Sequence, residues 1–194
     1  MKIILATQNQ GKLQEFQQLS KGKDLEFISI PEELQEMPEE TGKTFEENAL
    51  IKARYVSEYF RMPALADDSG LEVDALNGAP GVYSARYSSS GSDLDNCKKL
   101  LREMQGVIQE DRTARFKCCL SGYSEGEAIF AEGSLEGEIA EEFRGEMGFG
   151  YDPIFLIPDR NLHLAEIGKE EKNKISHRFK AFKIISGILP SLIS

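Results

Sequence analysis

The sequence contains no long apolar run. Its hydrophobic stretches fall far short of the ~20 residues that a membrane-spanning helix needs. The first seven residues include one lysine and an apolar run that is too short for the core of a signal peptide. These absences predict a protein without membrane spans or an export signal, and we expect it in the cytoplasm.

Positive charge is also scarce. The chain has 23 Lys and Arg against 33 Asp and Glu, which gives a formal net charge of −10. General binders of nucleic acid or anionic membranes need a basic surface, so neither partner is expected. A small anionic substrate, held by a local basic patch and a metal, remains compatible with this charge.

Cysteines are few and are not spaced as metal ligands. Cys97, Cys118 and Cys119 follow no metal-binding pattern. We interpret them as buried or half-buried thiols. A chain of 194 residues can bury its core without a disulfide or a structural metal, and it contains no repeat, low-complexity tract or linker. The sequence therefore predicts that residues 1–194 form a single domain.

The order of the expected elements is typical of an α/β fold. A strand at residues 2–6 is followed by a polar turn, a helix that ends by Gly22 and a strand at residues 25–30. Thr44 and Glu47 have the spacing of a capping box, which predicts a helix that ends before Pro63. Further strands are expected at residues 63–68, 71–76, 112–123, 127–133, 135–140 and 153–157, a loop at residues 77–95, and helices at residues 94–104 and from residue 176 to the end.

The polar turn at residues 7–12 is the first candidate site. It lies between a strand and a helix, and the free N–H groups at a helix N-terminus suit a phosphate. Lys12 adds a positive charge, and Thr7 and Asn9 can donate hydrogen bonds. The segment has only one of the two glycines of a nucleotide P-loop. The alternative interpretation is a polar loop with a surface lysine.

Two adjacent aspartates, Asp67 and Asp68, end an apolar strand. Successive strand side chains point to opposite faces, so only one of them is expected to enter a given site. A carboxylate there could bind Mg²⁺, which accepts one or two carboxylates together with waters and substrate phosphates. Glu39 or Glu40 could supply the second carboxylate. The alternative is turn chemistry at the following Ser69-Gly70.

Two later segments could contact a nucleotide. Residues 148–152 combine glycines with Phe149, Tyr151 and Asp152, and could stack on a base while the backbone reads its edge; a glycine-rich turn with core aromatics is the alternative. Residues 168–183 contain six basic and two acidic residues in an otherwise acidic chain. This stretch could neutralise a triphosphate, or it could be the solvated face of a helix.

Taken together, these segments resemble the inosine triphosphate pyrophosphatase family, whose bacterial members hydrolyse non-standard purine nucleoside triphosphates such as dITP, ITP and XTP. The matching segments occur in the family's order, at residues 7–12, 39–53, 66–71, 78–87, 148–153 and 171–178. Six motifs in order are a specific signal, whereas a single motif would be weak.

The resemblance implies an α/β fold with a long central mixed sheet flanked by helices, and two lobes with a nucleotide cleft between them. It implies a homodimer that cleaves the substrate between the α- and β-phosphates. Asp68 would be the general base and, with Glu40, a Mg²⁺ ligand. The substrate-binding residues carried over from the family are Thr7, Asn9, Lys12, Ser69, Phe149, Gly150, Tyr151, Asp152, Lys172, His177 and Arg178.

Two other functions remain open from the residues themselves. A nucleotide-binding regulatory module would need the phosphate loop but not the carboxylates Glu40 and Asp68. Glu40 and Asp68 therefore count against it. The other alternative is a phosphatase that removes only the terminal phosphate. The products formed from a triphosphate distinguish the three: pyrophosphate, orthophosphate or none.

Overall fold

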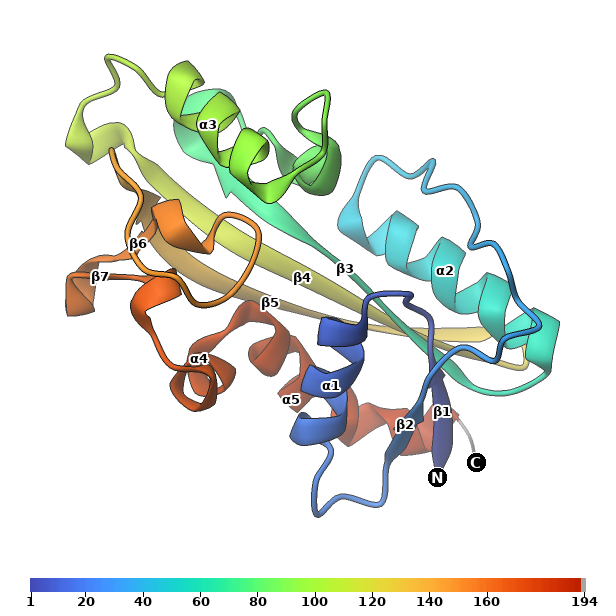
Figure 1. The fold of residues 1–194 in the computed structure, drawn as a ribbon. Helices are drawn as coiled ribbons and strands as arrows, with labels where there is room; N and C mark the ends of the chain where they lie inside the picture. The colour runs from blue at the N-terminus through green and yellow to red at the C-terminus, as the bar shows by residue number, and fades with distance from the viewer. Residues whose placement is uncertain (193–194) are drawn as a thin grey trace. The chain divides into compact units, whose positions relative to one another are not determined.

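The computed structural model describes residues 1–192, which form a seven-stranded sheet flanked by helices (Figure 1). The strands follow the order β2-β1-β3-β4-β5-β6-β7. Their bounds are β1 (Lys2–Leu5), β2 (Glu26–Ile28), β3 (Ala64–Val73), β4 (Thr113–Ser124), β5 (Glu127–Ile139), β6 (Phe155–Ile157) and β7 (Leu162–His163). Strand β1 pairs in parallel with β2 and β3, whereas β6 pairs antiparallel with β5 and β7. The predicted α/β fold with a mixed sheet is confirmed.

Five α-helices are described. They are α1 (Gln10–Leu19), α2 (Phe45–Phe60), α3 (Asp93–Glu103), α4 (Lys169–Ile175) and α5 (His177–Ile188). Short 3-10 helices are η1 (Asp74–Leu76), η2 (Gly81–Arg86), η3 (Gln109–Asp111), η4 (Asp152–Ile154), η5 (Pro158–Arg160), η6 (Leu164–Glu166) and η7 (Leu189–Leu192). Among residues 1–192, no helix combines the length and the apolar character needed to cross a bilayer.

The chain divides into two compact units, each of which draws on the long strands β3, β4 and β5. The first unit comprises Met1–Asp68, Cys118–Gly133 and the chain from Arg178 on. The second comprises Ser69–Lys117 and Ser134–His177.

In the first unit, helices cover both faces of the sheet. Ile3 of β1 packs in one apolar cluster with Phe16 of α1 and Phe182 of α5. Its neighbour Ile4 packs in another cluster with Val56 of α2. Because successive strand side chains point to opposite faces, the apolar run of β1 supplies both clusters.

The second unit has a core of its own. Leu71 and Val73 of β3 pack with Leu100 of α3, with Met104 at the C-cap of this helix and with Phe155 of β6. All five side chains are fully buried. Helix α3 is therefore fixed along its C-terminal half by the apolar core.

Two pairs of predicted strands are single strands in the structure. The break predicted at Ser69-Gly70 is wrong, since β3 continues through both residues. The hydroxyl of Ser84 accepts a hydrogen bond from the Leu71 N–H at 2.9 Å, which satisfies the backbone beyond the expected turn. Strand β5 likewise replaces the two strands predicted at residues 127–133 and 135–140.

Several helix boundaries differ from the prediction. The capping box of Thr44 and Glu47 is confirmed at the start of α2, whereas α1 ends at Leu19 rather than at Gly22. The predicted loop at residues 77–95 contains η2, and α4 is a separate helix that the sequence did not reveal because it lacks an apolar stripe. The last two residues of the predicted C-terminal helix, 193–194, lie outside the described residues.

Candidate functional site

The start of α1 presents the groups expected of a phosphate-binding turn. The Asn9 side chain caps the helix by accepting a hydrogen bond from the Lys12 N–H at 3.1 Å. The Thr7 hydroxyl accepts one from the Asn9 N–H at 3.1 Å and can still donate its own proton. The first turn of α1, described in full, holds no acidic residue. An anion would therefore meet the positive end of the helix without a competing carboxylate from the first turn itself.

The Lys12 side chain begins a buried ion-pair network on one face of β3. Its ammonium lies 2.5 Å from Asp67 Oδ1, and Arg178 Nε lies 2.6 Å from Asp67 Oδ2. Arg178 also donates to Glu15 Oε2 of α1 at 2.7 Å. Burial raises the pKa of Asp67, but the charges of Arg178 and Lys12 outweigh it and hold this pKa well below its usual range. Asp67 is thus ionised at neutral pH and orients two cations.

Asp68 lies on the opposite face of β3, as predicted from the strand geometry. Its Oδ1 is 2.8 Å from the ammonium of Lys52, which also lies 2.7 Å from Glu40 Oε1. Burial raises the pKa of Asp68 against the influence of Lys52, and Glu40 raises it further. Burial disfavours the charged form of Lys52, but Asp68 and Glu40 together raise its pKa. Two carboxylates therefore share one cation in a partly buried position.

The connector before α2 places Glu40 at this cluster. The Gly42 N–H donates to Asn48 Oδ1 of α2 at 2.8 Å, which fixes the connector against the helix. A Cβ atom at Gly42 would lie 2.6 Å from Asn48 Oδ1 and from Glu47 Cβ, so only glycine permits this approach. The Glu39 side chain, in contrast, is exposed. The structure therefore favours Glu40 over Glu39 as the second carboxylate, a choice that the residues alone had left open.

The Glu40–Asp68 pair fits a divalent cation. Together with Asp67 and Glu15, the first unit places four carboxylates around three cations, Lys12, Lys52 and Arg178. Mg²⁺ needs only one or two carboxylates when waters and phosphates complete its shell. The excess of acidic groups and the shared ammonium mark this as a position where a cation is favourable.

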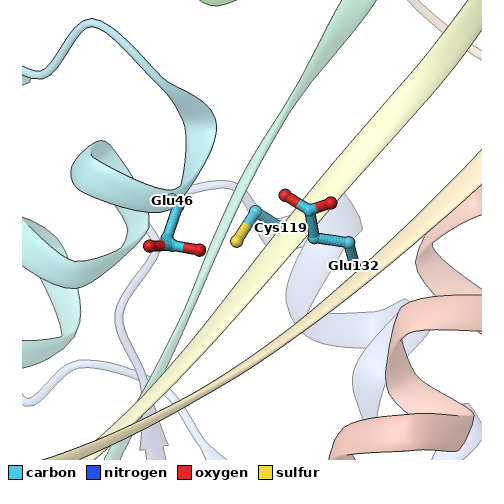
Figure 2. Close-up of side chains that lie close together, drawn as sticks. All are labelled: Glu46, Cys119 and Glu132. Carbon is cyan, nitrogen blue, oxygen red and sulfur yellow. The ribbon is translucent and has the colours of Figure 1, made fainter.

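A second group of potential ligands lies elsewhere on the first unit. Glu46, Cys119 and Glu132 bring their oxygen and sulfur atoms within 4.8 Å of one another, and Figure 2 shows the thiol between the two carboxylates. Burial, followed by the charges of Glu132 and Glu46, raises the pKa of Cys119 to about 12. The thiol is therefore protonated at neutral pH, and both carboxylates are exposed. These features are weak grounds for a metal site.

In the second unit, residues 148–152 form a tight turn with one exposed aromatic ring. Phe149 is 51% exposed, and the Lys172 ammonium lies 4.9 Å from the centre of its ring. Lys172 also pairs with the buried carboxylate of Asp152, which accepts the Phe149 N–H at 2.9 Å. A Cβ at Gly148 would lie 2.0 Å from Asp152 Oδ2, and Gly148 has a φ of +86°. Glycine is required at residue 148 because the carboxylate closes the turn.

Much of the backbone in this turn already has hydrogen-bond partners. Gly150 donates its N–H to Asp93 Oδ2 at 2.7 Å and accepts from the Cys97 thiol at 3.3 Å. Tyr151 is buried and donates its hydroxyl proton to the Ser84 carbonyl at 2.8 Å. The N–H and the carbonyl of Gly150 are therefore not available to read the edge of a base, as the sequence had suggested for this backbone. The Phe149 ring is the exposed feature of the turn that suits base stacking.

The basic C-terminal stretch does not act as one patch. Arg178 is buried in its ion pairs and Lys172 is paired with Asp152, whereas Lys180 and Lys183 are exposed, as the alternative interpretation expected. His177 is buried and stacks on Phe116, with ring centroids 5.2 Å apart. The contacts of Ser69, Lys172, His177 and Arg178 with a nucleotide stay predictions.

Lys52 and Glu15 were not identified as site residues from the sequence. Lys52 lies in the apolar stripe of α2, beside Ala49, Ala53 and Val56, yet its side chain is almost fully buried. A lysine in such a stripe is a usable signal, because a buried ammonium needs acidic partners. Glu15 is likewise buried in α1, where its carboxylate pairs with Arg178.

The fold and these clusters define an α/β protein in which a helix N-terminus without acidic residues in its first turn lies near paired carboxylates. The Ham1 family model matches residues 3–187, and the chain belongs to this family. The chain is 50% identical to the dITP/XTP pyrophosphatase of Bacillus licheniformis over 96% of this chain and 97% of that relative. It is 48% identical to the dITP/XTP pyrophosphatase of Bacillus subtilis, with 96% of each chain covered.

Solved structures agree with this assignment. A HAM1 protein from Coxiella burnetii superposes with a TM-score of 0.90 at 43% identity, covering 98% of this chain and 99% of that one. The Staphylococcus aureus Ham1 protein gives a TM-score of 0.88 at 42% identity, with the same coverage. The resemblance drawn from the six motifs is thereby confirmed at the level of the family and the fold.

Proposed function

We propose that this chain is a pyrophosphatase that hydrolyses dITP, ITP and XTP to the nucleoside monophosphate and pyrophosphate. The observation that carries this proposal is the pair of carboxylates, Glu40 and Asp68, which share the ammonium of Lys52. The names of the relatives from the two Bacillus species support the substrate class.

The phosphate chain is assigned to the cluster in the first unit. The N-terminus of α1, together with Thr7, Asn9 and Lys12, supplies hydrogen-bond donors and positive charge for it. The ammoniums of Lys12 and Lys52 stabilise the charge that develops on the pyrophosphate leaving group.

Asp68 is proposed as the general base that takes a proton from the attacking water. Burial and the neighbouring Glu40 raise its pKa, which brings its basicity closer to the working pH. The ammonium of Lys52 holds this carboxylate in place through Oδ1. The other oxygen of Asp68 is proposed as the proton acceptor.

A divalent cation, Mg²⁺ in our proposal, would be held by Glu40 and Asp68. When bound it would neutralise phosphate charge and orient the substrate. Lys52 must then give up at least part of its contact with these two carboxylates. Omitting divalent metal from the assay is expected to abolish turnover.

The purine base is assigned to the second unit, where Phe149 offers an exposed ring beside Lys172. A cationic donor favours the 6-oxygen of hypoxanthine and xanthine over the 6-amino group of adenine. We expect kcat/KM for ITP and XTP to exceed that for ATP and GTP by about two orders of magnitude or more, because sites built on such hydrogen bonds reject mismatched ligands strongly.

Product analysis tests the function directly. The protein is incubated with ITP, XTP, ATP or GTP and Mg²⁺, and pyrophosphate and orthophosphate are measured separately. Pyrophosphate from ITP and XTP is expected. Orthophosphate alone would indicate a terminal phosphatase, and binding without any product would indicate a regulatory module. The homodimer that the family resemblance implies is tested separately, by measuring the mass of the protein in solution.

A further inference from the structure

Helix α3 holds the backbone of the turn at residues 148–152 from one side. Asp93, in the first turn of α3, accepts the Gly150 N–H at 2.7 Å. Cys97, one turn later, donates its thiol proton to the Gly150 carbonyl at 3.3 Å. Residues four apart lie on the same face of a helix, so one face of α3 engages both polar groups of a single glycine.

Both hydrogen bonds to Gly150, from its N–H to Asp93 and from the Cys97 thiol to its carbonyl, are favoured by the protonation states of the two side chains. Burial, together with the charges of Asp93 and Asp152, raises the pKa of Cys97 to about 12, so the thiol keeps the proton that it donates. A hydrogen bond to the charged carboxylate of Asp93 is stronger than one to a neutral acceptor.

Helix α3 is itself firmly placed. The Ser92 side chain caps it by accepting the Asp95 N–H at 3.2 Å, and Leu100 and Met104 are fully buried in the core of the second unit. A helix fixed at both ends can position what it contacts. Asp93 is not needed for this placement, whereas Cys97 is itself buried in the same core and contacts Gly150 from there.

Gly150, with its two hydrogen bonds to α3 (here called the clamp), lies between one buried and one exposed aromatic residue. Tyr151 is buried, whereas Phe149 is 51% exposed. The Gly150 N–H belongs to the peptide group that joins Phe149 to Gly150, so its hydrogen bond to Asp93 constrains the backbone of Phe149. We propose that Asp93 and Cys97 are positioning residues that hold Gly150 and thereby hold Phe149 in the orientation that stacks on the purine base.

This inference rests on the proposed function for its consequence, but the clamp can be measured without substrate. Residue-resolved amide exchange of Gly150 is compared between the wild type, Asp93→Ala and Cys97→Ala. Loss of one hydrogen bond to a charged group should accelerate Gly150 exchange by about tenfold in Asp93→Ala. Exchange of the core amide of Leu120 should not change.

The functional consequence is measured by steady-state pyrophosphate release from ITP. Asp93→Ala should raise KM by about five- to tenfold and leave kcat within about twofold, because Asp68 and Glu40 are untouched. A merely destabilised enzyme would instead lose active fraction and kcat at an unchanged KM.

Conservative and matched variants complete the test. Asp93→Asn keeps an acceptor oxygen and Cys97→Ser keeps a donor, so both should recover most of the wild-type KM. Asp95→Ala removes a carboxylate from the same first turn, where Asp95 accepts a hydrogen bond from Ser90 rather than from Gly150. It should leave both the Gly150 exchange and KM unchanged.

The outcomes are distinct. Faster Gly150 exchange together with a raised KM in Asp93→Ala, both recovered in Asp93→Asn, supports the positioning role. Unchanged exchange, or faster exchange at an unchanged KM, overturns it. If the wild type releases no pyrophosphate from any nucleotide, the proposed function fails, and the exchange experiment still decides whether the clamp exists.

Discussion

Lys12 and Lys52 donate hydrogen bonds to the same backbone oxygen, the carbonyl of Asp67, at 3.3 and 3.0 Å. Lys12 comes from α1 and Lys52 from α2, so the two helices deliver their ammoniums to one point on β3. Two like charges at this distance repel each other unless anions surround them. Asp67, Asp68 and Glu40 supply these anions in the structure. Both ammoniums are therefore already in position to bind a polyphosphate.

The first prediction concerns the general base. Asp68→Asn should retain the fold and lower kcat by about two to four orders of magnitude, the usual scale for general-base catalysis. Asp67→Asn should act mainly on KM, since Asp67 orients Lys12 on the other face of β3. Both variants are measured at saturating Mg²⁺. A kcat for Asp68→Asn close to that of the wild type would rule out its assigned role.

Neighbouring glutamates provide a matched pair for the metal site. Glu40→Gln should raise the Mg²⁺ concentration needed for half-maximal activity by at least the ~10-fold that is typical of a disturbed metal site. Glu39→Gln should leave it unchanged, because the Glu39 side chain is exposed. Mg²⁺ titrations of activity compare the two variants, and equal shifts would contradict the choice of Glu40.

Arg178 offers a test of the buried network. Arg178→Ala leaves the carboxylates of Asp67 and Glu15 without their shared cation. Removing one partner from a buried ion pair typically costs about 3–5 kcal/mol of stability. Urea unfolding measures this loss, with Lys183→Ala, an exposed lysine on the same helix, as the control. Similar unfolding midpoints for the two variants would show that the network adds little.

The low pKa of Asp67 makes stability depend on acid pH. Burial opposes ionisation, but Arg178 and Lys12 hold the folded-state pKa below the value of about 4 that applies in the unfolded chain. The contribution is therefore fully present above that pH and is lost as the pH falls through the folded pKa. Urea unfolding between pH 7 and pH 3 should show a steeper decline for the wild type than for Asp67→Asn. Parallel curves would argue against this network as the source.

The local parts of the fold could be predicted from the sequence. The capping box of Thr44 and Glu47 and the opposite faces of Asp67 and Asp68 depend on residues close in the chain. Short-range rules failed at Ser69-Gly70, where turn propensity was overridden by the Ser84 hydroxyl. That hydroxyl comes from 13 residues further along and binds the Leu71 N–H.

The site was harder to predict because its partners are distant in sequence. Lys52 reaches Asp68 across 16 residues and Arg178 reaches Asp67 across 111. Asp93 and Gly150 are separated by 57 residues. No periodicity or local motif encodes such pairs, since they depend on how the helices pack on the sheet. The prediction of a basic patch at residues 168–183 failed for the same reason. Lys172 and Arg178 pair with carboxylates that are distant in sequence, so their charges do not add to a common surface.

Because Asp67 and Asp68 lie on opposite faces of β3, the site depends on the number of residues that precede them in the strand. A one-residue insertion or deletion between the start of β3 at Ala64 and Asp67 would turn every following side chain to the other face. A deletion would bring Asp68 to the strand position of Asp67, facing Arg178, and an insertion would bring Asp67 to the position of Asp68, facing Lys52. In either case the other carboxylate would fall outside both groups of cations. Substitutions along this strand change one contact at a time, but a change in its length by a single residue displaces both carboxylates at once.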